Sequence, residues 1–250
     1  MQMQDQHILM DSDVLNGIVT ASDIRKDEVI LEIGSGPGNL TKLLLKKAKK
    51  VIAIELDKIF ENNLKEMVKK HNNLEVYFGN ALNLINNFKF DKIISNIPYS
   101  ITEPLFKKLF RLNFKMGIII IGKNFYKNAI GKENKWRIIF NSFYKLELIK
   151  EVPRKFFSPP PRTDSVLISI KQKKPNRFEK IVRSIVLQDD KKLKNSIIKT
   201  FRDEFKLTNN QAKDKLFELL IPENILEKNV DYLSNKQFIF VIEKLRNLPS

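Results

Sequence analysis

The chain has 250 residues, a net charge of +16, 42% hydrophobic residues and no cysteine. This length suffices for one large α/β domain and a smaller one. The lack of cysteine excludes disulfides and thiolate metal sites and suits the cytoplasm. No apolar run approaches the ~18 residues of a membrane span, and the first residues lack the pattern of a signal peptide. His7 and His71 are too few and too far apart to indicate a metal centre. We therefore expect a cytoplasmic protein without a metal.

The positive charge indicates a polyanionic partner, most simply nucleic acid. Residues 1–175 hold 30 Lys and Arg against 18 Asp and Glu, so most of the excess lies outside the C-terminal part. Lysine accounts for 36 of the 45 basic residues, and codon bias could explain much of that content. The charge supports an RNA or DNA partner without proving one.

The predicted elements alternate along the first part of the chain. A helix capped by Asp13 is expected to end near Ala21. Five strands follow, with helices between them, at residues 29–33, 51–54, 74–78, 91–95 and 117–121. The helices are expected through residues 43–48, up to about residue 70, and through residues 105–110. This alternation predicts an α/β fold with a mostly parallel sheet and helices on both faces.

Residues 123–144 have a helical and basic pattern, and two further strands at 146–152 and 165–171 bring the predicted sheet to seven. The charged stretch 171–176 is the expected linker, and only helical patterns follow it. We therefore predict a domain over 1–172 and a small all-helical domain over 176–250.

The first predicted strand runs directly into Gly34, Gly36 and Gly38. Glycine permits a sharp turn with positive φ and lets a ligand lie against the main chain. The next strand ends at Glu55, where a carboxylate can bind both hydroxyls of a ribose. The G-x-G-x-G spacing differs from that of NAD proteins and favours S-adenosylmethionine (SAM). A tight turn alone also needs glycine, but together with Glu55 the pattern favours a ligand.

Two asparagines, Asn80 and Asn96, follow the third and fourth predicted strands. Parallel sheets bind ligands at the carboxyl ends of their strands. The glycine loop, Glu55 and both asparagines are therefore expected at one edge of the sheet.

The tetrapeptide Asn96-Ile97-Pro98-Tyr99 suits methyl transfer to an exocyclic amine, whose lone pair is delocalised into its ring. Hydrogen bonds from the amine to the Asn96 side chain and the Ile97 or Pro98 carbonyl would favour a tetrahedral nitrogen and aim its lone pair at the sulfonium methyl. Pro98 fixes the loop, and Tyr99 offers a face on which a base can stack. The alternative is an ordinary turn before a helix, with Tyr99 in the core.

A base in structured nucleic acid must be flipped out before it can react. Phe157, beside the run Pro159-Pro160-Pro161, is the candidate second aromatic that closes over the base. Phe156 is the competing choice, and one of the two is expected in the core. Three basic residues flank this loop and could hold phosphates, namely Arg154, Lys155 and Arg162. Asp164 is expected to be a structural cap.

Three stretches in order, residues 31–41, 96–99 and 157–166, resemble the ribosomal RNA adenine dimethyltransferases. Residues 5–9 look like an altered form of that family's Gly-Gln-Asn-Phe-Leu motif, and residues 191–195 resemble its basic helix in the second domain. The resemblance implies a monomeric, SAM-dependent, Rossmann-like enzyme that places two methyls on the N6 amine of adenines in ribosomal RNA. Small-subunit members of the family modify two adjacent adenines near the 3′ end during assembly of that subunit.

By motif match, the resemblance also implies residue roles. Tyr99 and Phe157 would sandwich the adenine, and SAM would contact His7, Leu9, Gly34, Glu55, Asn80 and Asn96. The chain departs from the family pattern at Asn80, at His7 and over residues 122–137, which look shorter than in family members and lack their Gln-Lys-Glu start. Asn80 stands for the usual Asp, and its amide can still accept from the adenine amine of SAM. His7 stands for the usual Asn.

Two alternatives to a small-subunit enzyme stay open. A large-subunit adenine methyltransferase of the macrolide-resistance type shares every motif, and only the proline run and residues 191–195 favour the small subunit. A nucleic-acid-binding relative that has lost methylation is disfavoured by the intact glycine loop and residues 96–99. The departures at His7 and Asn80 leave that reading open. A methyltransferase for a substrate other than nucleic acid is least expected, given the charge.

Overall fold

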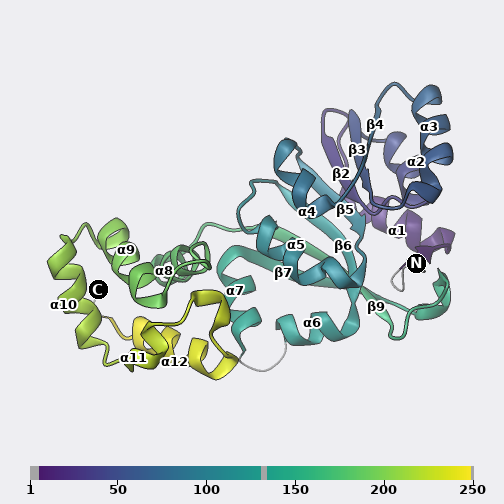
Figure 1. The fold of residues 1–250 in the computed structure, drawn as a ribbon. Helices are drawn as coiled ribbons and strands as arrows, with labels where there is room; N and C mark the ends of the chain where they lie inside the picture. Colours follow the sequence, from purple (N-terminus) through teal and green to yellow (C-terminus); the bar gives the residue numbers. More distant parts are fainter. Residues whose placement is uncertain (1–5, 131–133, 249–250) are drawn as a thin grey trace. The chain divides into compact units, whose positions relative to one another are not determined.

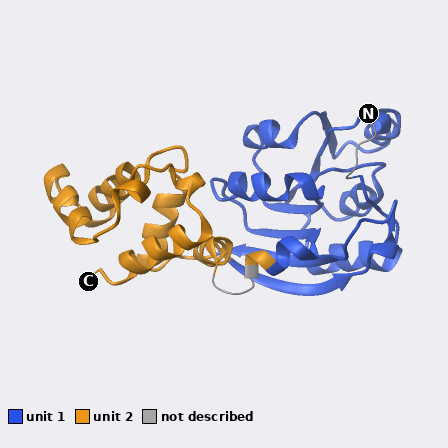
Figure 2. Cartoon of the chain, turned by 60° about the horizontal axis from the view of Figure 1, so that its bottom comes forward, with its two compact units in different colours: residues 1–127, 145–172 blue, residues 128–144, 173–250 orange. Residues whose placement is uncertain are grey.

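The computed structural model describes residues 6–130 and 134–248. The chain forms two compact units, which are coloured separately in Figure 2. Unit 1 comprises residues 1–127 and 145–172, and unit 2 comprises residues 128–144 and 173–250. Residues 128–144, which we predicted as part of the sheet domain, thus cluster with the C-terminal helices.

Unit 1 is built on a seven-stranded sheet in the order β4-β3-β2-β5-β6-β9-β7 (Figure 1). Its strands are β2 Val29–Ile33, β3 Lys50–Glu55, β4 Leu74–Phe78, β5 Lys92–Asn96, β6 Met116–Gly122, β7 Tyr144–Val152 and β9 Ser165–Gln172. The pairings from β4 through β6 are parallel, and β9 runs antiparallel to β6. The predicted mostly parallel sheet is confirmed. The central strands β2, β3, β5 and β6 are mostly buried, as expected of a sheet covered by helices on both faces.

The helices between the strands follow the predicted pattern with shifted ends. They are α1 Ser12–Ser22, α2 Asn39–Leu45, α3 Glu61–Lys70, α4 Ala81–Leu84, α5 Thr102–Leu109 and α6 Lys123–Ile130. The prediction of Asp13 as the first cap is wrong, because Asp11 accepts a hydrogen bond from the Val14 N–H at 2.8 Å. Helix α2 ends at Leu45, before the predicted Ala48.

A short strand outside the main sheet brings the N-terminal segment beside the proline loop. Strand β1 (Ile8–Leu9) pairs antiparallel with β8 (Phe157–Ser158), so that Ile8 faces Ser158 and Leu9 faces Phe157. The pair is extended by a hydrogen bond from the Met10 N–H to the Phe156 carbonyl at 2.9 Å. We call residues 6–9 the strap.

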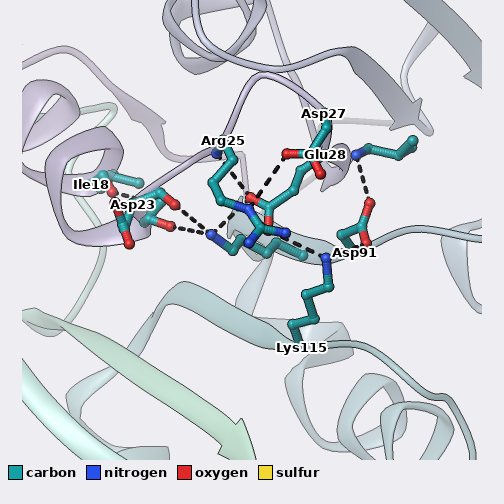
Figure 3. A network of polar contacts seen from close by, with 10 residues as sticks. Ile18, Asp23, Arg25, Asp27, Glu28, Asp91 and Lys115 are labelled. Carbon is teal, nitrogen blue, oxygen red and sulfur yellow. Dashed lines mark hydrogen bonds and ion pairs between the residues drawn. The ribbon is translucent and has the colours of Figure 1, made fainter.

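The amino ends of β2 and β5 carry a network of charged side chains around the buried Glu28 (Figure 3). Lys92 Nζ lies 2.9 Å from Glu28 Oε2, and both side chains are less than one-tenth exposed. The same ammonium donates to the carbonyls of Ser22 and Asp23, at 2.9 and 2.6 Å. Because those carbonyls end α1, Lys92 ties this helix to the sheet.

Unit 2 is helical in its described residues. Its helices are α7 Lys135–Phe143, α8 Arg177–Val186, α9 Leu193–Phe205, α10 Asn209–Glu218, α11 Glu223–Leu226 and α12 Asn235–Arg246. Arg183 explains why α7 belongs here. Its guanidinium donates to the carbonyls of Ser142, Phe143 and Lys173, and it lies 5.1 Å from the centre of the Phe143 ring. Within the described parts of both units, no helix is long and apolar enough to cross a membrane.

Candidate active site

A cavity of about 720 Å³, partly open to solvent, lies at the carboxyl ends of β2, β3 and β5. It is lined by the strap, the glycine loop, Glu32, Glu55 and residues 96–99. Because β2 has β3 on one side and β5 on the other, this is the point where the strand order reverses, which is where open α/β sheets bind ligands. Glu55 and Asn96 therefore open onto one shared space.

The three glycines of the loop all have positive φ, but for different reasons. A Cβ at Gly36 would meet nothing within 4 Å, so the main chain borders open space there. A Cβ at Gly34 would lie 3.2 Å from Pro98 Cδ, so this glycine allows the loop of residues 96–99 to approach. A Cβ at Gly38 would lie 2.5 Å from Met67 Sδ. Gly38, predicted at the cofactor, does not line the cavity and is required by the packing of α3.

The carboxylate of Glu55 is fixed by main-chain donors. It accepts hydrogen bonds from the N–H groups of Gly36, at 2.7 Å, and Asp57, at 2.8 Å. The residue is 6% exposed and lines the cavity. These two hydrogen bonds hold the glycine loop against the end of β3.

Glu32 is a site residue that we did not single out from the sequence. It lies on β2, is buried and lines the cavity, and it accepts a 2.6 Å hydrogen bond from the Thr41 hydroxyl. Burial raises the pKa of Glu32 against the opposing effect of the Thr41 hydrogen bond, and with the added repulsion from Glu55 the pKa reaches about 8. The available signal was a lone acid within an otherwise apolar strand.

The lining residues fit SAM. The Ser35 hydroxyl is buried and finds no hydrogen-bond partner among the described residues, although buried polar atoms are normally paired. Gly36 leaves room beside it. Two acidic side chains, Glu32 and Glu55, suit a ligand that carries positive charge and hydroxyl groups. Among the described residues, no group of His, Cys, Asp and Glu is arranged to hold a metal ion.

Asn96 connects the loop of residues 96–99 to the strap. Its Nδ2 donates to the His7 carbonyl at 2.9 Å, and its Oδ1 can act only as an acceptor. Tyr99 is half-buried, and its hydroxyl is hydrogen-bonded to that of Ser165. Pro98, Tyr99, His7 and Leu9 all line the cavity. Asp5, part of the predicted N-terminal motif, lies outside the described residues.

Besides Gly38, two further predicted site residues, Asn80 and Phe157, do not line the cavity. Asn80 is exposed, and its Oδ1 caps α4 by accepting from the Leu82 N–H at 2.9 Å. Phe157 is 4% exposed and belongs to the hydrophobic core. Of the two phenylalanines, Phe156 is the more exposed, with Lys155 Nζ 5.4 Å from its ring centre. Asp164 accepts from the Arg154 N–H at 2.9 Å, as expected of a cap.

Comparison with known proteins agrees with this geometry. Residues 3–234 match the family model described as ribosomal RNA adenine dimethylase. A Methanosarcina acetivorans protein named probable ribosomal RNA small subunit methyltransferase A is 33% identical, over 98% of this chain and 94% of its own length. A dimethyladenosine transferase from Plasmodium falciparum superposes with a TM-score of 0.67 and 28% identity, over 96% of this chain and 98% of that one.

The 23S rRNA methyltransferase ErmE shares the fold, with a TM-score of 0.61 and 20% identity over 96% of this chain and all of the other. The family match covers both units, apart from the last helix. The chain therefore belongs to the ribosomal RNA adenine dimethylase family and is a SAM-dependent methyltransferase.

Proposed function

We propose that this enzyme dimethylates the N6 amines of two adjacent adenosines near the 3′ end of small-subunit ribosomal RNA during assembly of that subunit. The observation that carries the proposal is the shared cavity, in which Glu55 and Asn96 face the same space at the switch point of the sheet. The relative from Methanosarcina acetivorans, which is named for the small subunit, supports this choice of RNA.

The cofactor would be held by the carboxyl edge of β2 and β3. Gly34 and Gly36 let it lie against the main chain, Glu55 faces its ribose, and Glu32 faces its positive charge. The Leu9 main chain, held by a 3.1 Å hydrogen bond from Asn39 Nδ2, covers the site from the strap side. When bound, SAM supplies an electrophilic methyl group on its sulfonium.

The target amine would be oriented by the loop that follows β5. The free Oδ1 of Asn96 accepts one N–H, and the main-chain carbonyl of Ile97 or Pro98 accepts the other. These two hydrogen bonds favour a tetrahedral nitrogen and point its lone pair at the methyl group. Tyr99, anchored through its hydroxyl on Ser165, offers a stacking face to the flipped base.

Unit 2 is proposed to bind the RNA beside the reacting adenosines. Two lysines of the basic segment 191–195 are already paired within this unit, because Lys192 and Lys194 both contact Glu227. These two ion pairs hold the pKa of Glu227 down at about 2. Lys191 is exposed beside them, so we expect it to contribute more to phosphate binding than its paired neighbours.

A methylation assay tests the proposal. The protein is incubated with labelled SAM and either under-methylated small subunits or large-subunit RNA, and the RNA is digested to nucleosides. We expect dimethyladenosine from the small subunit, and RNA binding that weakens steeply with salt. Label only in large-subunit RNA would assign the other substrate. SAM binding without transfer to either RNA would point to a non-catalytic relative.

A further inference from the structure

The end of α10 carries two neighbouring apolar side chains that face solvent. Phe217 is 81% exposed and Leu220 is 72% exposed, whereas Leu216, Leu219 and Ile221 beside them are buried. The Leu220 N–H donates to the Phe217 carbonyl at 3.1 Å, so the two residues are one helical turn apart. Single exposed apolar residues are common on protein surfaces, but an adjacent pair forms a patch. We call Phe217 and Leu220 the α10 patch.

Phe217 differs from the other phenylalanines of unit 2. Several of these are buried in the core of the unit, namely Phe140, Phe143, Phe201 and Phe238. The remaining ones each have a cationic side chain 4.6 to 5.6 Å from the centre of the ring, namely Phe178, Phe205 and Phe240. Neither the core nor a cation of the described residues covers Phe217. Its ring is therefore open to a partner.

Leu220 also holds an unfavourable main-chain conformation. Its φ is 51°, in the left-handed region. The residue that follows a helix often adopts this conformation, but it is usually glycine, because a Cβ destabilises the left-handed form. The exposed side chain of Leu220 gains nothing from the core of the unit in return. Local strain of this kind points to a function for the residue.

The charge around the α10 patch is unlike that of the whole chain. The chain carries +16, but residues 209–226, which span α10 and α11, hold two lysines and three acidic residues and have a net charge of −1. Asp214 and Glu218 lie next to Phe217 on α10 and are exposed, and no ion pair among the described residues neutralises them. An RNA backbone would be repelled by these carboxylates. A protein surface with lysine or arginine around an apolar centre would be complementary to them.

We propose that the α10 patch docks on a protein of the small-subunit precursor, at a surface whose apolar centre is bordered by lysine or arginine side chains. This inference rests on the proposed function, since the precursor is the substrate named there. The patch would add a contact with protein to the RNA contacts proposed for the basic segment 191–195. A single aromatic anchor can supply much of the affinity of such an interface.

The first test compares binding to two probes, under-methylated small subunits and the same ribosomal RNA freed of protein. Phe217→Ser should weaken binding to the small subunits by roughly 10- to 30-fold, the loss typical of truncating one aromatic anchor. Binding to the protein-free RNA should change by less than about 2-fold. Val68→Ser, a similar change at an exposed apolar residue of α3, is the matched control and should equal the parent on both probes.

Leu220→Gly separates docking from folding. This change removes the exposed side chain and relieves the left-handed conformation, so the midpoint of urea denaturation should stay the same or rise. Binding to the small subunits should nevertheless weaken by about 3- to 10-fold. Because the variant is at least as stable as the parent, misfolding could not explain this loss.

A charge reversal distinguishes a protein partner from RNA. Glu218→Lys places a cation beside Phe217 and should weaken binding to the small subunits, because it repels the cationic border of the partner. If the patch contacted RNA, the added cation should instead tighten binding to both probes. That result would overturn the inference.

Photo-crosslinking identifies the partner directly. Phe217 is replaced by the photoreactive p-benzoylphenylalanine, and the enzyme is irradiated together with purified small subunits. We expect a crosslink to one ribosomal protein, in a segment that contains lysine or arginine. A crosslink to RNA or to a second copy of the enzyme would overturn the inference, and so would unchanged binding of Phe217→Ser and Leu220→Gly.

These measurements separate the inference from the proposed function. If the patch variants lose binding to small subunits but the parent methylates neither RNA, the proposed function fails while the docking surface stands. If the parent dimethylates the small subunit and the patch variants bind it as tightly as the parent, only the docking surface fails.

Discussion

The two edges of the central sheet each contain a buried glutamate, but only one of these glutamates has a cationic partner in the protein. At the amino edge, Glu28 lies 2.9 Å from Lys92 and 3.5 Å from Lys115. At the carboxyl edge, Glu32 is equally buried, and the part of the chain that the structure describes places no cation against it. At the amino edge, lysines of the protein neutralise the buried acid. At the carboxyl edge, which faces the cavity, we expect a bound ligand to provide the positive charge.

The same difference appears in the two carboxyl pKa values. Burial would raise the pKa of Glu28, but hydrogen bonds from the Arg25 N–H and from Lys92, together with the charge of Lys115, outweigh burial and lower it. Burial raises the pKa of Glu32 to about 8. A carboxylate that is paired with a cation of the protein helps to hold the fold together. An acid next to a cavity and without such a partner favours the binding of a cationic ligand. The predictions below test this contrast.

The largest effect is expected from breaking the pair at the amino edge. Lys92→Met leaves the Glu28 carboxylate buried beside an apolar side chain, and it also removes the bonds to the end of α1. Such a loss should lower the free energy of unfolding by about 3–5 kcal/mol, measured by urea denaturation. Lys115→Met, at a side chain 52% exposed, should cost less than about 1 kcal/mol. Equal costs would mean that burial does not decide the strength of these pairs.

A comparably large effect is expected on catalysis at the other edge. Asn96→Ala removes the proposed acceptor for the amine and the donor that holds the His7 carbonyl. We expect kcat to fall by roughly 10²–10³-fold, the range for losing one preorganised polar contact in a transition state. Asn96→Asp keeps the acceptor and should retain more activity than the alanine variant. A SAM affinity that falls as steeply as kcat in Asn96→Ala would show that the strap contact is its main role.

The unpaired acid should reveal itself in the pH dependence of stability. The pKa of Glu32 is raised from its ordinary 4.5 to about 8, so the folded state gains a proton that the unfolded state lacks. The contribution of Glu32 to the free energy of unfolding is fully present below pH 4.5 and is lost as the pH rises through 8. Between pH 6 and 8, the parent should lose about 2 kcal/mol more stability than Glu32→Gln.

Glu28→Gln provides the contrasting profile. Because the pKa of Glu28 is lowered, its stabilisation is present above its ordinary value of 4.5 and is lost on further acidification. If both substitutions changed the pH dependence of stability in the same direction, the proposed difference between the two edges of the sheet would be contradicted.

A smaller effect is expected when the cofactor binds. At pH 7, Glu32 is mostly protonated, and a sulfonium in the cavity favours its carboxylate, so binding should release protons. Calorimetry in buffers of different ionisation enthalpy should detect a release of less than about one proton per SAM. The demethylated product has a neutral sulfur and should release fewer protons. Glu32→Gln should abolish the difference, and its persistence would exclude Glu32 as the source.

The smallest effect is expected at Asn80, which we predicted at the cofactor and which the structure shows capping α4. Asn80→Ala should lower the free energy of unfolding by about 1 kcal/mol, as for other helix caps. The SAM dissociation constant should change by less than about 3-fold, because the residue does not line the cavity. A ten-fold weakening of SAM binding would show that Asn80 contributes to the cofactor site.

Much of this site could be predicted from local sequence. The glycine turn, Glu55 and residues 96–99 each follow an apolar strand, and parallel strands end at one edge. Glu32 was missed because a single acid in an apolar strand does not show which face it occupies. Residues 128–144, which we predicted within the domain over 1–172, cluster with the C-terminal helices, and a helical pattern alone does not say which neighbour it packs against.

The sequence by itself determined the order of strands and helices, the class of ligand and the loop that carries the chemistry. These follow from periodicity, from the conformational freedom of glycine and from residues close together in the chain. Only the tertiary structure decided that Phe157 joins the core and that His7 faces Tyr99. Those placements depend on the strap meeting the proline loop, where contacting residues such as His7 and Pro159 are 152 positions apart. No local pattern encodes such a meeting, because it is decided by which distant segments bury each other's apolar surface.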